Sequence, residues 1–221
     1  MRKDPLVSGC YYHIISRSIA QFKIFKNQND CYRLMKIMDF YRYSGFAYKY
    51  SNFIALNKNF QQDYLRSIKN NSPKLINIVA YCLMPTHIHL LLEQNIDNGI
   101  TKYLTKLLNS FSRYFNLYHH RRGPLWESHF KSILVNTDSQ LLHLTRYIHL
   151  NPVSANLVKK PEKWQFSSYN EYLGKITNGI CDWKDIIDIN SDKYQKFVNS
   201  RIAYQKELSR IKHLLIEDAG K

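Results

Sequence analysis

Two histidines one residue apart, His87 and His89, are the residues whose type and spacing point most directly to chemistry. They lie in the run MPTHIHLLL (residues 84–92), whose aliphatic residues are typical of a buried strand. Because positions i and i+2 of a strand face the same way, the two imidazoles should project side by side. Together they could supply two ligands of a divalent metal. The alternative is a pair of strand histidines that are satisfied by hydrogen bonds.

A second candidate group lies in the segment YIHLNP (residues 147–152). On a helix, Tyr147 and Asn151 are one turn apart and share a face. Tyr147 could present a phenol, and Asn151 a neutral amide oxygen, to one site. A metal held by two imidazoles and an amide oxygen would stay Lewis-acidic and keep positions open for a substrate. The alternative is structural, with Tyr147 in the core and Asn151 capping the helix before Pro152.

Basic side chains form the third group. The chain has 32 Lys and Arg against 17 Asp and Glu, a formal net charge of +15. This charge indicates a polyanionic partner, and it favours nucleic acid over a membrane because no cationic amphipathic terminal helix is evident. A basic composition inherited from a low-GC genome is the alternative. Trp126 could stack on exposed bases or pack in the core. The candidate phosphate contacts are Lys102, Lys106, Arg113, Arg121, Arg122 and Lys131.

The overall composition bounds the class of protein. A chain of 221 residues, 44% of them hydrophobic, suits one domain with a sizeable core, or one domain with an appended segment. The longest apolar stretch, residues 76–84, is too short to cross a bilayer, and the N-terminus lacks the apolar core of a signal peptide. We therefore expect a cytoplasmic protein, associated with the nucleoid. The scattered cysteines include no C-x-x-C pair, which argues against a structural zinc site.

Hydrophobic periodicity predicts the elements that position these groups. Strands are expected at residues 11–18, 75–84, 87–94 and 129–136, and helices at 29–43, 100–118 and 139–150. The last of these helices should stop near Asn151, because Pro152 disfavours helical geometry in the residue before it. Residues 46–73 are interpreted as an insertion, and the predicted C-terminal additions are a loop and helix at 164–173 and a charged helix at 191–217. The element order predicts a ferredoxin-like (RRM-like) α+β fold, an antiparallel sheet with helices packed on it.

Several segments, taken together and in order, resemble the REP-associated tyrosine transposases, which belong to the HUH class of single-tyrosine transposases. They are YCLMPTHIHLLL (residues 81–92), GPLWESHF (123–130), YIHLNPV (147–153) and WQFSSY (164–169). The similarity also includes residues 11–17 and covers the chain from about residue 11 to 174. It implies a transposase domain over residues 1–175, followed by a helical extension over residues 176–221.

The resemblance assigns roles to the candidate residues. His87 and His89 match the two metal-binding histidines of the HUH motif. Tyr147 matches the nucleophile, and Asn151 the polar residue that completes the metal site. The implied activity is a metal-dependent endonuclease and strand transferase, using Mg²⁺ or Mn²⁺, that acts on single-stranded or hairpin DNA through a 5′-phosphotyrosine intermediate. The resemblance also makes Arg17 a DNA contact, and it implies either a monomer or a homodimer.

Three alternatives remain open from the sequence. Tyr114 is a rival nucleophile, because it lies in another stretch that resembles the family, FSRYFN (residues 111–116). The protein could instead bind structured nucleic acid without cleaving it, although the intact set of four site residues argues against this. It could also be a metal-dependent nuclease that uses water, with Tyr147 as a packing residue.

Overall fold

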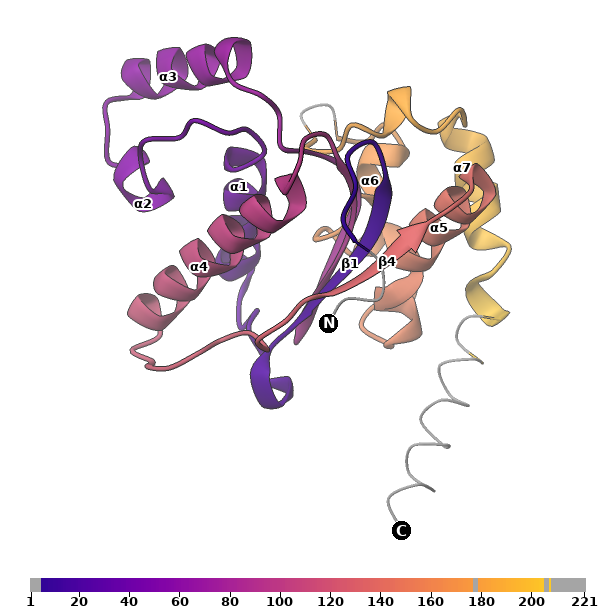
Figure 1. Ribbon diagram of the computed structural model, residues 1–221. Helices are drawn as coiled ribbons and strands as arrows, with labels where there is room; N and C mark the ends of the chain where they lie inside the picture. Colours follow the sequence, from indigo (N-terminus) through magenta and orange to yellow (C-terminus); the bar gives the residue numbers. More distant parts are fainter. Residues whose placement is uncertain (1–4, 177–178, 205–206, 208–221) are drawn as a thin grey trace.

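The computed structural model describes residues 5–176, 179–204 and 207. A four-stranded antiparallel sheet forms its centre, with the spatial order β2-β3-β1-β4 (Figure 1). The strands are β1 (Tyr11–Arg17), β2 (Ile76–Met84), β3 (His87–Gln94) and β4 (Lys131–Val135). The predicted α+β class is confirmed, and the histidine-bearing strand β3 lies inside the sheet between β2 and β1.

Helices cover both faces of the sheet (Figure 1). The helices α1 (Gln28–Phe40) and α4 (Gly99–Tyr118) pack on one face, and α5 (Asp138–Ser154) packs on the other against β2 and β3. Each face therefore has its own hydrophobic core. The shorter helices are α2 (Tyr50–Phe53), α3 (Lys58–Asn71), α6 (Tyr169–Tyr172) and α7 (Ser191–Asn199), and 3₁₀ turns occur at Ile19–Gln21, Pro161–Lys163 and Trp183–Asp185.

A β-bulge in β2 allows this strand to serve both cores. The pairing register with β3 shifts between Ile78 and Ala80, so one extra residue enters β2. As a result Ile78 and Tyr81, which would otherwise face opposite ways, both contribute to the core beneath α1 and α4. Ala80 and Cys82 contribute to the core beneath α5. Burial on both faces explains why this strand reads as a nearly continuous apolar run.

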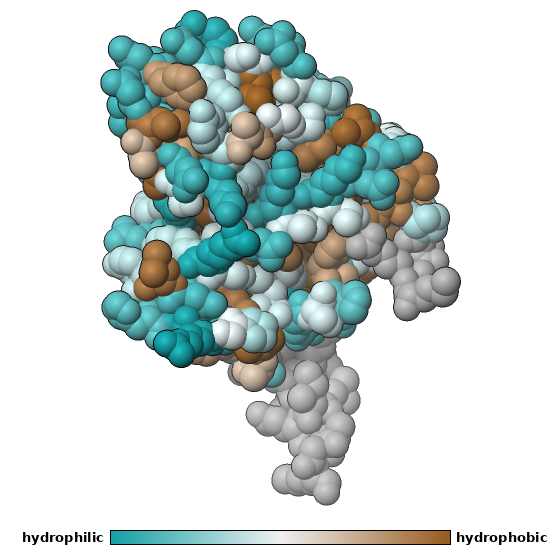
Figure 2. All heavy atoms as spheres, turned by 60° about the vertical axis from the view of Figure 1, so that its left-hand side comes forward, coloured by the Kyte–Doolittle hydropathy of each residue, from teal (hydrophilic) through white to brown (hydrophobic). Residues whose placement is uncertain are grey.

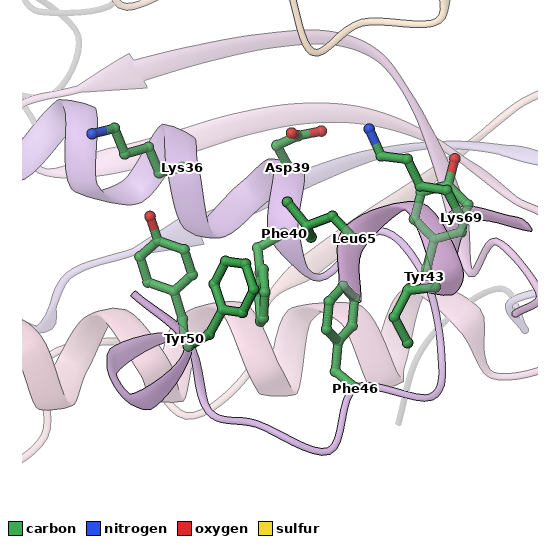
Figure 3. A pocket seen from close by; sticks show the side chains of 10 residues that line it. Lys36, Asp39, Phe40, Tyr43, Phe46, Tyr50, Leu65 and Lys69 are labelled. Atoms are coloured by element: carbon green, nitrogen blue, oxygen red, sulfur yellow. The ribbon is translucent and has the colours of Figure 1, made fainter. Parts of the chain in front are cut away.

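Most of the predicted insertion forms α2 and α3 and packs on α1 through aromatic rings (Figure 3). The ring of Phe40 lies at the centre, with centroid distances of 4.0 Å to Phe46, 5.1 Å to Tyr50 and 4.8 Å to Phe53. Because such rings bury large apolar areas, this cluster anchors the insertion to the first core.

The prediction that the helix of Tyr147 stops near Asn151 is wrong, because α5 continues through Pro152 to Ser154. Proline has no N–H to donate to the carbonyl four residues earlier, that of Ile148. The side-chain nitrogen of Asn151 donates to this carbonyl instead, at 3.4 Å, and to the carbonyl of Tyr147 at 3.1 Å. The residue before the proline thus compensates for the lost backbone donor, and the helix persists.

The C-terminal elements complete the second core. Trp183 stacks on Tyr172 with ring centroids 4.3 Å apart, and Tyr194 of α7 is buried beside them, 4.6 Å from Tyr172. The predicted tail helix is observed over Ser191–Asn199 and again at residues 202–204, and its predicted parts at 205–206 and 208–217 lie outside the described residues. The boundary between a domain 1–175 and an extension 176–221 stays a prediction. None of the helices within the described ranges is long and apolar enough to span a bilayer.

Candidate active site

Strand β3 presents His87 and His89 on the face of the sheet that α5 covers. The alternate residues Ile88 and Leu90 point the other way, into the core beneath α1 and α4. The two imidazole centroids are 4.9 Å apart, with the ring planes at 80°. This is the side-by-side placement expected for positions i and i+2 of a strand.

Helix α5 brings Tyr147 to the same place. Its ring centroid lies 5.9 Å from that of His89, with the rings edge to face. The residue is 37% exposed, so a substrate can reach it, and it is not the fully buried core residue of the structural alternative. Burial raises the pKa of the phenol, and the positive charge of Arg17 acts in the opposite direction.

A third histidine, His13 of β1, joins the group and was not identified from the sequence. Its Nε2 lies 2.9 Å from Nδ1 of His89, and the two rings stack at a centroid distance of 5.2 Å. The ring of Tyr147 lies 6.0 Å from that of His13. The pairing of β1 with β3 creates these contacts, with Ile15 opposite His89. This register cannot be derived from the residues around His13, so no local sequence pattern indicates that His13 belongs to the site.

Each histidine of β3 has one ring nitrogen in a hydrogen bond. Nδ1 of His87 is hydrogen-bonded to Thr86 Oγ1 at 3.0 Å, and Nδ1 of His89 is bonded to His13. Within the described part of the chain, neither Nε2 has a hydrogen bond. Burial, with a contribution from Arg17, lowers the pKa of His87 to about 4, and burial also places the pKa of His89 well below its ordinary value. A neutral imidazole with one nitrogen anchored and the other free is the usual form of a histidine metal ligand.

Asn151 is the remaining member of the candidate donor set. Its side-chain nitrogen is used by the helix carbonyls, and its amide oxygen has no hydrogen bond to any described residue. Amide oxygens are suitable ligands for hard cations. The described residues contain no group of three or more His, Cys, Asp or Glu side chains that could hold a metal ion. The candidate set remains the two imidazoles and the Asn151 oxygen.

Two basic side chains lie on the active face. Arg17, at the end of β1, is directly opposite His87 in the strand register, and both line a cavity of about 310 Å³ together with Thr86 and Glu127. Lys131 pairs with Ile15 at the start of β4 and shares the face of the histidines. A guanidinium beside the histidine pair is well suited to a phosphate group.

The other basic candidates lie elsewhere. Lys106 and Arg113 line a cavity beside α1 and α4, and Lys102 is exposed on the same helix α4. Arg121 donates hydrogen bonds to Asn116 in the last turn of α4 and to the carbonyls of Gly123 and Pro124, which indicates a structural role for its guanidinium. Arg122 is exposed in that loop. The predicted phosphate contacts therefore lie on separate surfaces of the protein, and their role in DNA binding stays a prediction.

Two aromatic candidates have other roles. Trp126 is 8% exposed and packs against Phe111, with ring centroids 5.9 Å apart, so base stacking by this residue is wrong and the core-packing alternative holds. Tyr114, the rival nucleophile, lies on α4 across the sheet from the histidines and bonds through its hydroxyl to Asp30 at 3.4 Å. It does not share a site with His87 and His89.

An antiparallel sheet that presents two neutral histidines beside a helical tyrosine is the arrangement that the resemblance implied for single-tyrosine transposases. The sequence profile of the family described as "Transposase IS200 like" matches residues 45–151. This stretch, just under half of the chain, is thus similar to the IS200-like transposases, and the resemblance to REP-associated tyrosine transposases is confirmed.

Two known proteins are similar to this chain. A protein of Haemophilus influenzae, provisionally named a REP-associated tyrosine transposase, is 31% identical over 104 residues, which cover 42% of this chain and 58% of that protein. The match thus spans somewhat more than half the length of the relative. A solved structure of a REP-associated tyrosine transposase bound to a REP hairpin has a TM-score of 0.52 and 13% identity, and the match covers 86% of this chain and 95% of that one. This likeness shows a shared fold.

Proposed function

We propose that the protein is a metal-dependent endonuclease and strand transferase that cleaves single-stranded DNA at hairpin-associated sites. The observation that carries this proposal is the Tyr147 ring, 5.9 Å from the ring of His89 and beside two neutral imidazoles whose Nε2 atoms are free of hydrogen bonds to the described residues. The relative that was solved with a REP hairpin supports hairpin DNA as the substrate.

Tyr147 acts as the nucleophile in this proposal. Its hydroxyl oxygen forms a bond to phosphorus while the bond from phosphorus to the 3′ oxygen breaks. The tyrosine becomes esterified to the 5′-phosphate, the phenol gives up its proton, and the leaving 3′ oxygen gains one. Because one phosphate ester replaces another, the strand can be rejoined without an external energy source. A phenol ordinarily has a pKa near 10, and burial raises the pKa of Tyr147 further. The positive charge of Arg17 opposes this effect and favours the phenolate.

The proposed cofactor is Mg²⁺ or Mn²⁺, which when bound supplies polarisation of the scissile phosphate and neutralises the charge that develops on its oxygens. His87 and His89 would hold the metal through their Nε2 atoms, and Asn151 through its amide oxygen. Thr86 and His13 orient the two rings by bonding their Nδ1 atoms.

DNA is the proposed partner, as a single strand or a hairpin. Arg17 and Lys131 lie on the active face, where they can neutralise phosphates next to the cleaved one. The protein acts as a monomer or a homodimer, and in a homodimer Tyr147 of one copy could serve the histidines of the other. A protein that acts on DNA would work in the cytoplasm, at the nucleoid.

Covalent capture of labelled DNA tests this function. The protein is incubated with Mg²⁺ or Mn²⁺ and a hairpin DNA with a single-stranded flank, labelled at either end, and is then denatured. The expected adduct carries the 3′ label, because the protein retains the 5′-phosphate of the downstream fragment. It should be absent in Tyr147→Phe and after chelation of the metal, and present in the control Tyr118→Phe, which alters an exposed tyrosine of α4.

The outcomes separate the three functions. Cleavage without an adduct supports the nuclease that uses water. Binding without cleavage supports the protein that recognises structured nucleic acid. An adduct that persists in Tyr147→Phe contradicts the assignment of the nucleophile.

A further inference from the structure

A cavity of about 360 Å³ lies between α1, the start of α2 and α4, across the sheet from the histidines. This volume falls within the range of about 300–1,000 Å³ that is usual for ligand sites. The lining combines four cations and two aromatic rings: Arg33, Lys49, Lys106, Arg113, Tyr41 and Tyr114. The proposed cleavage chemistry uses none of these residues.

The cations of this cavity have no acidic partners. Its lining contains no Asp or Glu, and in the described part of the chain none of the four cations forms an ion pair. Arg33 lies instead between two rings, with Cζ 4.6 Å from the centroid of Tyr50 and 4.9 Å from that of Tyr114, and its buried Nε has no hydrogen-bond partner. The ammonium of Lys106 lies 5.9 Å from the ring of Tyr41. The cavity therefore attracts an anion.

The cavity continues into a second one of about 500 Å³, which shares Arg33 and Tyr114 and adds Lys36, Lys58 and Tyr32. This extension also contains no acidic residue. The two cavities form one groove along the outer side of α1, bordered by the inserted segment that contains α2. Figure 2 turns this side of the molecule toward the viewer, and hydrophilic side chains cover much of it with apolar patches between them.

We propose that this α1–α4 groove binds a stretch of single-stranded DNA that is not being cleaved. Cations spaced along a groove match the repeated phosphates of a strand, and the exposed ring of Tyr32 and the half-buried ring of Tyr114 offer faces on which bases stack. An acidic peptide or a lipid headgroup would use the cations but not the ring faces. The identification of DNA as the molecule bound in the groove rests on the proposed function. Because the sheet separates the groove from His87 and His89, the groove contributes to DNA binding and takes no part in the chemistry.

Binding of a fluorescent twelve-residue oligothymidylate tests the proposal. The measurement uses the Tyr147→Phe protein, so that cleavage does not intervene. Replacing Lys106 and Arg113 by Ala should weaken binding about tenfold or more. It should also reduce the slope of log affinity against log salt by about 1.4, since each phosphate contact on a single strand contributes about 0.7.

The matched control removes the same charge elsewhere. Lys159 and Lys193 are exposed on the side of the molecule that carries α5 and α7, and their double replacement by Ala should leave both affinity and salt slope unchanged. Thermal unfolding of both double variants should stay close to that of the parent, because Arg113, Lys159 and Lys193 are exposed and Lys106 is half-buried. None of the four forms an ion pair within the described residues.

Photocrosslinking locates the bound strand independently of affinity. An oligothymidylate that contains 4-thiothymidine should crosslink to the peptide that includes Tyr114, and polyglutamate should compete poorly. The proposal is overturned if the Lys106 and Arg113 double variant behaves like the control, if crosslinks form only outside the groove, or if polyglutamate competes as well as DNA. Failure of wild-type cleavage while these groove results hold would contradict the proposed function alone.

Discussion

Replacing His13 by Phe tests the mechanism that orients the metal-binding edge of His89. The substitution keeps a ring in the stacked position, 5.2 Å from His89, but deletes the nitrogen that lies 2.9 Å from Nδ1 of His89. In the tautomer that can bind a metal, Nδ1–H of His89 donates to this nitrogen; without the acceptor, His89 can place its proton on Nε2, where the proton blocks a metal. We therefore expect His13→Phe to weaken Mn²⁺ binding while the protein remains folded.

The magnitude follows from the burial of the pair, since both His13 and His89 are 4% exposed. An N–H left without a partner in such a place costs about 1–3 kcal/mol. Loss of an outer partner of a ligating histidine typically lowers metal affinity about 10–100-fold, which corresponds to about 1.4–2.8 kcal/mol. The two estimates agree, so a loss of about one to two orders of magnitude in Mn²⁺ affinity is the expected result.

Mn²⁺ titration by calorimetry in the absence of DNA measures the effect, and nitrogen NMR of the His89 ring reports which nitrogen carries the proton. His13→Gln serves as the matched variant, because its amide oxygen can accept the same hydrogen bond and should recover most of the affinity. Equal Mn²⁺ affinity in wild type and His13→Phe, with the same His89 tautomer, would refute the reasoning.

Three further predictions concern α5. Burial lowers the pKa of His149 to about 3 from its ordinary 6.5, so the unfolded chain binds a proton in this interval that the folded chain does not, and the free energy of unfolding falls as the pH falls from 6.5 toward 3. His149→Gln should flatten that dependence by up to about 1.4 kcal/mol per pH unit in urea unfolding at different pH values. Asn151→Leu should lower the free energy of unfolding, measured by thermal unfolding, by about 1 kcal/mol, because the Ile148 carbonyl loses its donor. The same substitution should weaken Mn²⁺ binding. Adding Pro152→Ala returns a backbone N–H to the helix and should restore the stability but not the Mn²⁺ affinity. Tyr194→Phe removes a hydroxyl 2.6 Å from His149 and should cost about 1–3 kcal/mol of stability without changing Mn²⁺ affinity.

Local sequence patterns were sufficient for the elements that carry the site. The bounds predicted for β3, residues 87–94, are those observed, because aliphatic residues alternate with the histidines and Pro85 precedes the strand. The same-face relations of His87 with His89, and of Tyr147 with Asn151, follow from the repeat of a strand and of a helix. These pairs are near neighbours in the chain, and for this reason their relative orientation can be predicted from the sequence.

Most of the features that the sequence did not reveal depend on contacts between distant segments. His13 meets His89 only through the register of β1 on β3. Trp126 looked available for base stacking, yet it is buried against Phe111 of α4. The rule for the residue before a proline failed at Asn151, since this side chain replaces the missing backbone donor. The first two cases required tertiary geometry, whereas the Asn151 contact is local but is not encoded by hydrophobic periodicity.

The central claim is that Tyr147 carries the 5′-phosphate of the cleaved strand, and mass spectrometry of the covalent adduct tests it most directly. After nuclease and trypsin digestion, residues 147–159 form the expected peptide, YIHLNPVSANLVK, which begins at the tyrosine itself. The account predicts a nucleotide joined through its 5′-phosphate to Tyr147 of this peptide. A nucleotide on Tyr114 or on any other residue, or cleaved DNA with no modified peptide, would contradict the account.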